Sequence, residues 1–338
     1  MRYRPLGRTG VQVSALTLGT MNFGSLGSTT QDDATAIVRR ALDAGITVFD
    51  TADVYSHGES EEMLGRALRG VDRNDVVLAT KFRLDMGGPN RGGGSRRWIV
   101  RAVEDSLRRL GTDHIDLYQM HRPAPGTDID ETLSALDDLQ RAGKVLYVGS
   151  STFSAAEIVE AQWAAERRGV VRFTTEQPPY SLLTRGIEAD VLPVAQRHGM
   201  GVLVWGPLAG GFLSGKYRSG HEPETTHRDT TVLGRTGTGP DDLAKRAAAE
   251  RLLDLAESHA MMLIEMALAF TLTHPAVTSA IVGPRTLQQL ESQLGAADRL
   301  LTTEVLDAID TIVEPGRTLK PSDASALNPA LKAANRRR

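Results

Sequence analysis

Residues 48 to 62 carry much polar chemistry where a strand is expected to end. The stretch reads VFDTADVYSHGESEE, so two apolar residues that suit a core are followed by Asp50, Asp53 and Tyr55. One interpretation is an ordinary turn that leads into a helix, because Asp, Ser and Gly favour turns and Ser60 followed by two glutamates is typical of a helix start. The other is a reactive site, because enzymes place reactive groups at strand ends that face a cleft.

The rest of the chain supplies the elements that would position such a site. Short β-branched segments are predicted to be strands at 15–19, 47–51, 76–81, 115–120, 145–151, 172–177, 201–206 and 279–283. Amphipathic segments, several with a capping residue before them and Gly after them, are predicted to be helices at 31–45, 60–70, 95–111, 128–143, 154–169, 187–199, about 241–274 and 286–298. This alternation indicates right-handed βαβ units and a parallel sheet.

Eight such units predict a closed (β/α)8 TIM barrel, an α/β fold of about 250 residues to which this chain adds further segments. The 338 residues are expected to form a single domain with an N-terminal hairpin at about 1–14 and a Gly/Thr-rich segment at 215–240. An extra C-terminal helix is expected after residue 300, with a tail at about 315–338. An open doubly wound sheet is the alternative fold.

The composition argues against several classes of protein. Basic residues number 39 and acidic residues 42, 41% of the residues are apolar, and there is no cysteine, so neither nucleic-acid binding nor disulfides nor thiolate metal sites are expected. The most apolar long segment, AMMLIEMALAF, is too short to span a bilayer, and the N-terminus has no stretch of signal-peptide type. A cytoplasmic protein without membrane contact is expected, and a homo-oligomer is left open.

The predicted strand ends bring four reactive groups to one place. The second strand leads into Asp50 and Tyr55, the third ends in Lys81, and the fourth leads into His121. In a barrel, the carboxyl ends of all strands meet at one mouth. An acid, a phenol, an ammonium and an imidazole are therefore expected to face the same cleft. The later strands end in Ser151, Gln177 and Trp205.

Long motifs in a fixed order identify a family that this chain resembles. GITVFDTADVYSHGESEEMLGRAL and RAVEDSLRRLGTDHIDLYQMHRP are followed by GKVLYVGSSTF, EQPPYSLL, WGPLAGGFLSGKY and IVGPRTLQQLESQLGA. Together they resemble the aldo-keto reductase superfamily over essentially the whole chain, and most of all its bacterial, channel-β-subunit-like branch. The resemblance implies reduction of small-molecule aldehydes or ketones to alcohols by hydride transfer from NADPH.

The resemblance also implies a catalytic tetrad of Asp50, Tyr55, Lys81 and His121. A carbonyl that takes a hydride on carbon needs a proton on oxygen, and Tyr55 would be the general acid. Lys81 would stabilise the resulting phenolate, and Asp50 would hold Lys81 in place and keep it charged. His121 would hydrogen-bond the carbonyl oxygen or assist the proton transfer.

The remaining polar residues of the opening stretch are expected to have ordinary roles. Asp53 and His57 are interpreted as loop residues, Ser60 as a helix cap, and Glu61 and Glu62 as a solvated first turn. Neither an HExxH pair nor a carboxylate cluster of metal-ligand type occurs in the chain, so no metal is expected.

The usual dinucleotide motif GxGxxG after a strand is absent, and the GxxxxGK of GGFLSGKY lacks the Ser or Thr of a phosphate loop. The resemblance instead implies that the nicotinamide stacks on Trp205 and that Ser151 and Gln177 bond its carboxamide. A glycine-rich loop would cover the pyrophosphate, and Arg285 would pair with a 2′-phosphate. The cofactor contacts expected on this basis are Gly19, Thr20, Met21, Asp50, Ser151, Thr152, Gln177, Trp205, Gly206, Pro207, Leu208, Gly210, Gly211, Leu213, Lys216, Gly283, Arg285, Gln289 and Gln293.

Three departures from the family pattern concern the cofactor. Thr152 stands where an Asn is common, GPR replaces GAR, and Ser292 with Gln293 replaces an acid–amide pair. Two further functions use the same fold. A cofactor-binding regulatory subunit with little turnover is the alternative to the enzyme, although such subunits carry an amide where His121 stands. Net oxidation of a sugar alcohol would use the same residues in the opposite direction.

Overall fold

The structure is a computed structural model that describes residues 1–216 and 239–324. Most of the Gly/Thr-rich segment predicted at 215–240 and the last part of the predicted tail lie outside the described residues.

Parallel strands close into a barrel in the order β10-β3-β4-β5-β6-β7-β8-β9, so the predicted (β/α)8 fold is confirmed and the open sheet is wrong. Every predicted strand is present, and only β5 runs one residue beyond its predicted range. The strands are β3 (Leu16–Gly19), β4 (Val48–Asp50), β5 (Val77–Phe82), β6 (Ile115–Met120), β7 (Val145–Ser151), β8 (Thr175–Gln177), β9 (Gly201–Val204) and β10 (Ser279–Val282).

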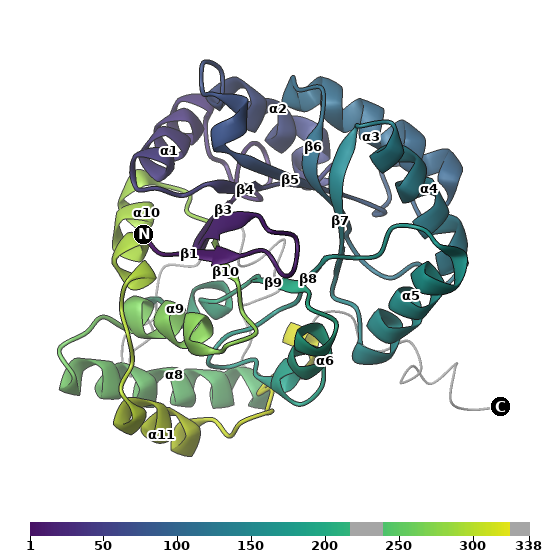
Figure 1. Ribbon diagram of the computed structural model, residues 1–338. Coiled ribbons are helices and arrows are strands. Elements are labelled where there is room, and N and C mark those ends of the chain that lie inside the picture. The colour runs from purple at the N-terminus through teal and green to yellow at the C-terminus, as the bar shows by residue number, and fades with distance from the viewer. Residues whose placement is uncertain (217–238, 325–338) are drawn as a thin grey trace.

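Helices surround the barrel (Figure 1). They are α1 (Gln31–Asp43), α2 (Glu59–Ala67), α3 (Arg96–Leu110), α4 (Ile129–Arg141), α5 (Ala155–Arg168), α6 (Val191–Arg197), α8 (Pro240–Ser258), α9 (Leu263–Thr273), α10 (Leu287–Leu294) and α11 (Thr303–Ile312). Several begin and end as the sequence indicates. Ser154 forms a capping box with Glu157 at the start of α5, and Gly169 ends that helix in the left-handed conformation.

The single long helix predicted at about 241–274 is wrong, because α8 and α9 meet there at an angle of 96°. The chain turns at Ala260, whose φ is +51°. Helix α8 has an exposed face, whereas α9 is buried along most of its length. Within the described ranges, no single helix has the length and apolar character needed to cross a bilayer, and only this bent pair has them jointly.

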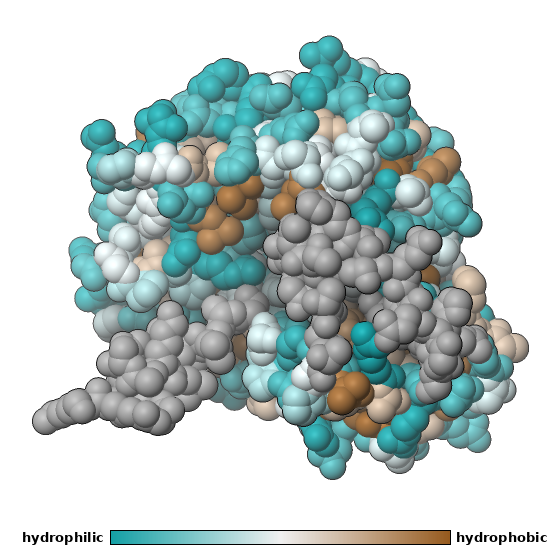
Figure 2. All heavy atoms as spheres, turned by 180° about the vertical axis from the view of Figure 1, so that it is seen from behind, coloured by the Kyte–Doolittle hydropathy of each residue, from teal (hydrophilic) through white to brown (hydrophobic). Residues whose placement is uncertain are grey.

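The predicted N-terminal hairpin is present as β1 (Tyr3–Pro5) and β2 (Gln12–Ser14), and it closes one end of the barrel (Figure 1). Leu6 and Val13 pack there against residues such as Val48 and Leu203, which lie early in or within the strands. The hairpin lies so close to β9 that a Cβ on Gly7 would come within 2.5 Å of the backbone nitrogen of Gly201. The carboxyl ends of the strands therefore open on the opposite side, which is the face turned toward the viewer in Figure 2.

Candidate active site

A fully buried lysine is the centre of the site at the carboxyl ends of the strands. The ammonium group of Lys81 on β5 donates to Asp50 Oδ2 at 2.5 Å and to the backbone oxygen of Thr51 at 2.8 Å. It lies 3.4 Å from Tyr55 Oη. Because β4 and β5 are neighbours in register, the acid at the end of one strand meets the lysine near the end of the next. Three members of the predicted tetrad therefore contact one another.

Two glutamines hold the other oxygen of Asp50. Gln119 donates to Asp50 Oδ1 at 3.0 Å, and Gln177 donates to the same atom at 2.9 Å. Gln177 also donates to Gln119 Oε1 at 3.1 Å, so both amides are fixed. Gln119 was not predicted, because a residue inside the β6 strand gave no sign that its side chain faces an acid. The nitrogen of Gln177 is engaged in this network, and its side-chain oxygen accepts no hydrogen bond within the described part of the chain.

A tight turn carries Tyr55 back over the lysine. Residues Tyr55–Gly58 form a short 3-10 helix in which Ser56 and His57 have φ values of +49° and +54°, a conformation that few non-glycine residues adopt. The Lys81 ammonium lies 5.0 Å from the centroid of the Tyr55 ring. The ring of His121 meets that of Tyr55 edge to face, with 5.6 Å between centroids. The phenol thus has a cation and an imidazole as neighbours.

The environment sets the charge of two of these groups. Burial lowers the pKa of His121 well below its ordinary value, and repulsion from Lys81, Arg122 and Arg83 lowers it further. The imidazole is therefore neutral near pH 7. Burial alone would lower the pKa of Lys81, but attraction to Asp50 and Tyr55 outweighs it and raises that pKa. Lys81 is therefore a cation in spite of its burial.

The predicted nicotinamide residues lie at the ends of the next strands. Ser151 is the last residue of β7 and donates to the backbone oxygen of Gln177 at 2.9 Å. Thr152 has a φ of +60°, and Trp205 follows β9 with its indole nitrogen buried and without a partner in the described residues. Gly19 ends β3 at a place where a Cβ would lie 2.6 Å from Ile281 Cγ2, so the backbone there is closely packed.

The predicted pyrophosphate loop begins directly after Trp205. Gly206, Pro207 and Leu208 lead into a 3-10 segment, Ala209–Ser214, in which Gly210 and Gly211 have φ values of 66° and 102°. Those values require glycine-like freedom and leave backbone amides unscreened by side chains. Leu213 is buried within this segment, and Lys216 is the last residue described before the gap.

The predicted adenosine residues follow β10 and lie on α10. The backbone nitrogen of Arg285 donates to Gln289 Oε1 at 2.8 Å, and Gly283 accepts a hydrogen bond from Asn22 at 2.6 Å. Arg285 is half-buried, and its guanidinium forms no ion pair within the described ranges. Gln293 is buried, and its side-chain oxygen has no partner among the described residues. Thr20 and Met21 lie after β3, and Thr20 is bonded to the backbone oxygen of Asp50.

Two interpretations of the opening stretch are wrong. Ser60 does not cap a helix, because α2 begins at Glu59 and the Ser60 hydroxyl bonds to the backbone oxygen of Thr20 at 2.8 Å. Glu61 is not solvated but fully buried, and it accepts from Arg109 Nε at 2.6 Å. Glu62 is exposed as predicted. Glu61 is buried because it lies on the face of α2 that packs against α3, whereas Glu62 lies on the exposed face.

Asp53 lies in the turn after β4, as interpreted, but its burial was not predicted, and neither were the positions of two arginines near His121. Asp53 is 1% exposed and neither of its oxygens has a partner in the described residues. Burial raises the pKa of Asp53 to about 8, and repulsion from Glu61 contributes. Arg83 and Arg122 lie next to His121, and their positions two residues after Lys81 and one after His121 were the available signal.

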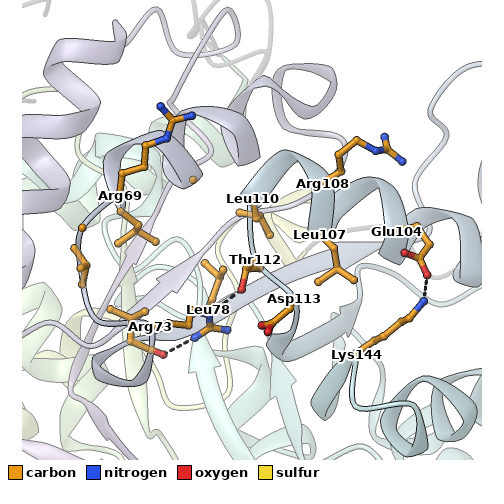
Figure 3. A pocket seen from close by; sticks show the side chains of 16 residues that line it. Arg69, Arg73, Leu78, Glu104, Leu107, Arg108, Leu110, Thr112, Asp113 and Lys144 are labelled. Atoms are coloured by element: carbon orange, nitrogen blue, oxygen red, sulfur yellow. Dashed lines mark hydrogen bonds and ion pairs between the residues drawn. The ribbon is translucent and has the colours of Figure 1, made fainter.

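A wide depression elsewhere on the surface does not belong to this site. It has a volume of about 930 Å³ and lies beside α2 and α3, toward the start of β5 (Figure 3). Its Arg73 is held by Asp116 at 2.5 Å and by the backbone oxygen of His114 at 3.0 Å, and its Lys144 pairs with Glu104. These cations are thus engaged in structural ion pairs. No group of metal-binding side chains is found among the residues that the structure describes.

The fold and the site define a (β/α)8 barrel with an Asp–Tyr–Lys–His cluster at its mouth. The model of the aldo/keto reductase family matches residues 15–314. The uncharacterized oxidoreductase YrpG of Bacillus subtilis is 40% identical over 323 residues, which cover 92% of this chain and 96% of that protein. The chain therefore belongs to the aldo/keto reductase family, a family of oxidoreductases.

Two other relatives differ in what their names describe. A probable voltage-gated potassium channel subunit beta from Oryza sativa subsp. japonica is 36% identical over 329 residues, 94% of this chain and 99% of its own length. The L-glyceraldehyde 3-phosphate reductase of Escherichia coli K12 is 34% identical over 328 residues, 94% of this chain and 93% of its own length. The relatives that resemble this chain thus include one named as a reductase and one named as a probable channel subunit.

Proposed function

We propose that this protein reduces an aldehyde or ketone to an alcohol with NADPH and that Tyr55 is the general acid. The observation that carries the proposal is the buried Lys81–Asp50 pair beside the Tyr55 hydroxyl, with the His121 ring against the same phenol. The reductase activity named for the relative from Escherichia coli supports it. Membership of the aldo/keto reductase family supports a nicotinamide cofactor.

The residues at the mouth suit NADPH. Trp205 offers an indole face after β9, the loop at 206–216 has glycines without side chains that would obstruct a ligand, and the buried oxygen of Gln293 lacks a partner in the described residues. Arg285 offers a guanidinium without an ion pair there, and a 2′-phosphate suits it because guanidinium groups bind phosphate in a bidentate way. When bound, NADPH would supply the hydride.

The chain's own residues handle the carbonyl oxygen and the proton. The Tyr55 hydroxyl and a neutral His121 N–H would both donate to that oxygen, which orients the carbonyl and stabilises the negative charge that develops on it. As the carbonyl carbon accepts the hydride, the proton of Tyr55 Oη moves to the oxygen and an alcohol forms. The Lys81 ammonium stabilises the phenolate left behind, which recovers a proton from solvent. Asp50 keeps the lysine charged and in place, and Gln119 and Gln177 keep Asp50 in place.

A cofactor-binding regulatory subunit is the second candidate, because a probable channel subunit is similar over almost its whole length. His121 favours the enzyme, since its neutral imidazole suits a substrate oxygen next to Tyr55. The cytoplasmic location and the single domain stay predictions, and a homo-oligomer is left open.

The test is the rate of NADPH oxidation with a panel of aldehydes, ketones and sugars. We expect turnover by the natural chain, and we expect Tyr55→Phe to lower kcat/KM by about 10²–10⁴-fold because a general acid is lost. NADPH affinity, measured by quenching of tryptophan emission, should change only a few-fold. Tyr147→Phe is the matched control, because it removes a hydroxyl from the opposite end of the barrel.

Two outcomes would contradict the proposal. A Tyr55→Phe protein that reduces carbonyls at the parent rate would remove Tyr55 from the mechanism. A natural chain that binds NADPH tightly yet turns over no carbonyl in the panel would favour the regulatory subunit.

A further inference from the structure

Two arginines flank His121 at the mouth of the barrel. Strands β5 and β6 pair with Phe82 opposite Met120, so the next residues, Arg83 and His121, are also neighbours. The backbone nitrogen of His121 donates to the oxygen of Phe82 at 3.0 Å, which fixes this arrangement. Arg122 follows His121 directly. The two arginines therefore come from adjacent strand ends, and the charge of each acts on the imidazole that contacts Tyr55.

The side chain of Arg122 is fixed toward the mouth. Its Nη1 donates to the backbone oxygen of His121 at 2.7 Å and to Thr152 Oγ1 at 2.9 Å, and its guanidinium carbon lies 5.7 Å from the centroid of the Trp205 ring. All three partners are neutral groups. The cation is thus oriented by hydrogen bonds that leave its charge uncompensated.

Arg83 is held without any side-chain partner in the described residues. Its Nε is buried and unbonded, although a guanidinium nitrogen without a hydrogen bond is costly to bury. Its φ is +106°, which an arginine rarely adopts. Neither the packing nor a hydrogen bond in the described chain explains why a strained, partly buried cation stands here.

No carboxylate pairs with either arginine within residues 1–216 and 239–324. Two buried acids at the mouth are already engaged: Asp50 by Lys81 and two amides, and Glu176 by the Ser150 hydroxyl at 2.5 Å and the Phe153 nitrogen at 3.1 Å. Burial also raises the pKa of Glu176 to about 7, so only about half of this carboxyl group is ionised near neutral pH. With Lys81, the mouth holds three cations near one another and an excess of positive charge.

We propose that Arg83 and Arg122 form an anion subsite beside His121, so that the preferred carbonyl substrate carries a carboxylate or a phosphate. The inference rests on the proposed function, since it names the class of substrate for the same site. The carbonyl oxygen would face Tyr55 and His121, and the anionic group at the other end of a short molecule would receive donors from the arginines. Guanidinium forks suit both anions because two parallel N–H donors match two oxygens.

The electrostatics of the mouth agree with this role. Burial lowers the pKa of Arg83 and of Arg122 below the ordinary range, which reflects the loss of water around both groups, and each cation repels charge on His121. An anion bound between them would replace part of the lost hydration. A cleft with one sign of charge and little water also attracts oppositely charged ligands from a distance.

The experiment compares kcat/KM for charged and neutral members of two matched pairs. One pair is succinic semialdehyde and its methyl ester, and the other is glycolaldehyde phosphate and glycolaldehyde. The natural chain should prefer the charged member by about 10–100-fold, as expected for hydrogen bonds between charged groups. The preference should shrink as salt is added, because screening weakens the attraction.

Variants then assign the preference to the two arginines. Arg83→Gln and Arg122→Gln should each reduce the ratio of charged to neutral kcat/KM by about 10-fold or more. A loss of cofactor affinity affects both members of a pair equally and therefore cancels in this ratio. Arg122→Lys keeps the positive charge and should restore part of the preference for the charged member. Arg97→Gln, which removes an exposed arginine on α3, controls for net charge and should leave the ratio unchanged.

Equal kcat/KM for charged and neutral members in the natural chain, or a preference that survives in both Gln variants, would overturn the anion subsite while leaving the proposed reductase intact. A protein that reduces neither pair would instead count against the proposed function. Calorimetry then measures the affinities for γ-hydroxybutyrate and for its methyl ester, which tests the anion subsite without turnover. Tighter binding of the anion that is lost in Arg83→Gln supports the subsite, and equal binding of the two overturns it.

Discussion

The two ends of the barrel are built from the same strands but hold opposite kinds of side chain. At the amino end, Leu6 and Val13 of the hairpin region pack on Val48 and Leu203, and this cluster is wholly apolar. At the carboxyl end, Asp50 and Lys81 are equally buried, but they are charged. Burying apolar groups stabilises the fold, whereas burying charges costs free energy unless each is paired and hydrogen-bonded.

The comparison shows how one scaffold separates stability from chemistry. The hairpin removes water from one end, where the buried side chains are mostly apolar and the few polar ones, such as Ser14 and Thr17, are uncharged and hydrogen-bonded. The mouth keeps its charges because every oxygen of Asp50 and the ammonium of Lys81 has partners from neighbouring strands. A substitution at the amino end should therefore alter only the stability of the fold. A substitution at the mouth should alter ligand affinity or the pH dependence of the protein.

The largest expected effect tests the amino end. Leu6→Ala removes a side chain that is 1% exposed and leaves a cavity, so the free energy of unfolding should fall by about 2–5 kcal/mol. Denaturation in urea measures it, with Leu300→Ala, at a residue 72% exposed, as the control that should change little. Carbonyl reduction at a temperature where the variant stays folded should be unchanged. A proportional loss of activity would show that the two ends are coupled.

The next effect tests the guanidinium of Arg285, a charge at the mouth that should affect NADPH binding and leave the stability of the fold unchanged. Arg285→Ala removes a guanidinium free to meet a 2′-phosphate, so NADPH binding should weaken by about 1–3 kcal/mol and NADH binding should hardly change. Titration of tryptophan emission measures both affinities, and Arg251→Ala on α8 serves as the exposed control. Equal loss for the two cofactors would show that Arg285 does not contact the phosphate.

The last effect, which is small over any single pH unit, tests the buried acid Asp53 near the mouth. The pKa of Asp53 is raised from 3.8 to about 8 in the folded protein, so between those values the folded state keeps a proton that the unfolded state loses. Stability therefore falls as pH rises through this window, by about 1.4 kcal/mol per pH unit from this group. Asp53→Asn should remove that slope.

Unfolding in urea at about pH 6 and about pH 8 measures the Asp53 effect. The contribution of Glu176, whose pKa is raised to about 7, is common to both proteins and cancels in the comparison. The same pH dependence in Asp53→Asn and in the natural chain would show that Asp53 ionises normally.

The sequence was sufficient for the fold because its signals are local. Runs of β-branched residues marked every strand, and capping residues such as Ser154 marked helix ends. The break between α8 and α9 was not predictable in the same way. Apolar residues continue across it without a proline, and only the requirement to cover the barrel turns the chain at Ala260.

The catalytic candidates were also within reach of the sequence, because reactive residues directly after strands must meet in a parallel barrel. Asp50, Tyr55, Lys81 and His121 do lie together. The residues that hold these groups in place could not be predicted from the sequence. Gln119 looks like any polar residue in a strand, and Ser60 and Glu61 look like a helix start, until packing places them inside.

The sequence by itself determined the order of strands and helices and the kinds of group at the strand ends, since both follow from residues close together in the chain. Only the tertiary structure decided which of those groups are buried and how they are charged. A pKa depends on lost water and on charges across space, and the field at His121 comes from Lys81, Arg83 and Arg122 on two different strands. That is why the imidazole is neutral and the mouth positive.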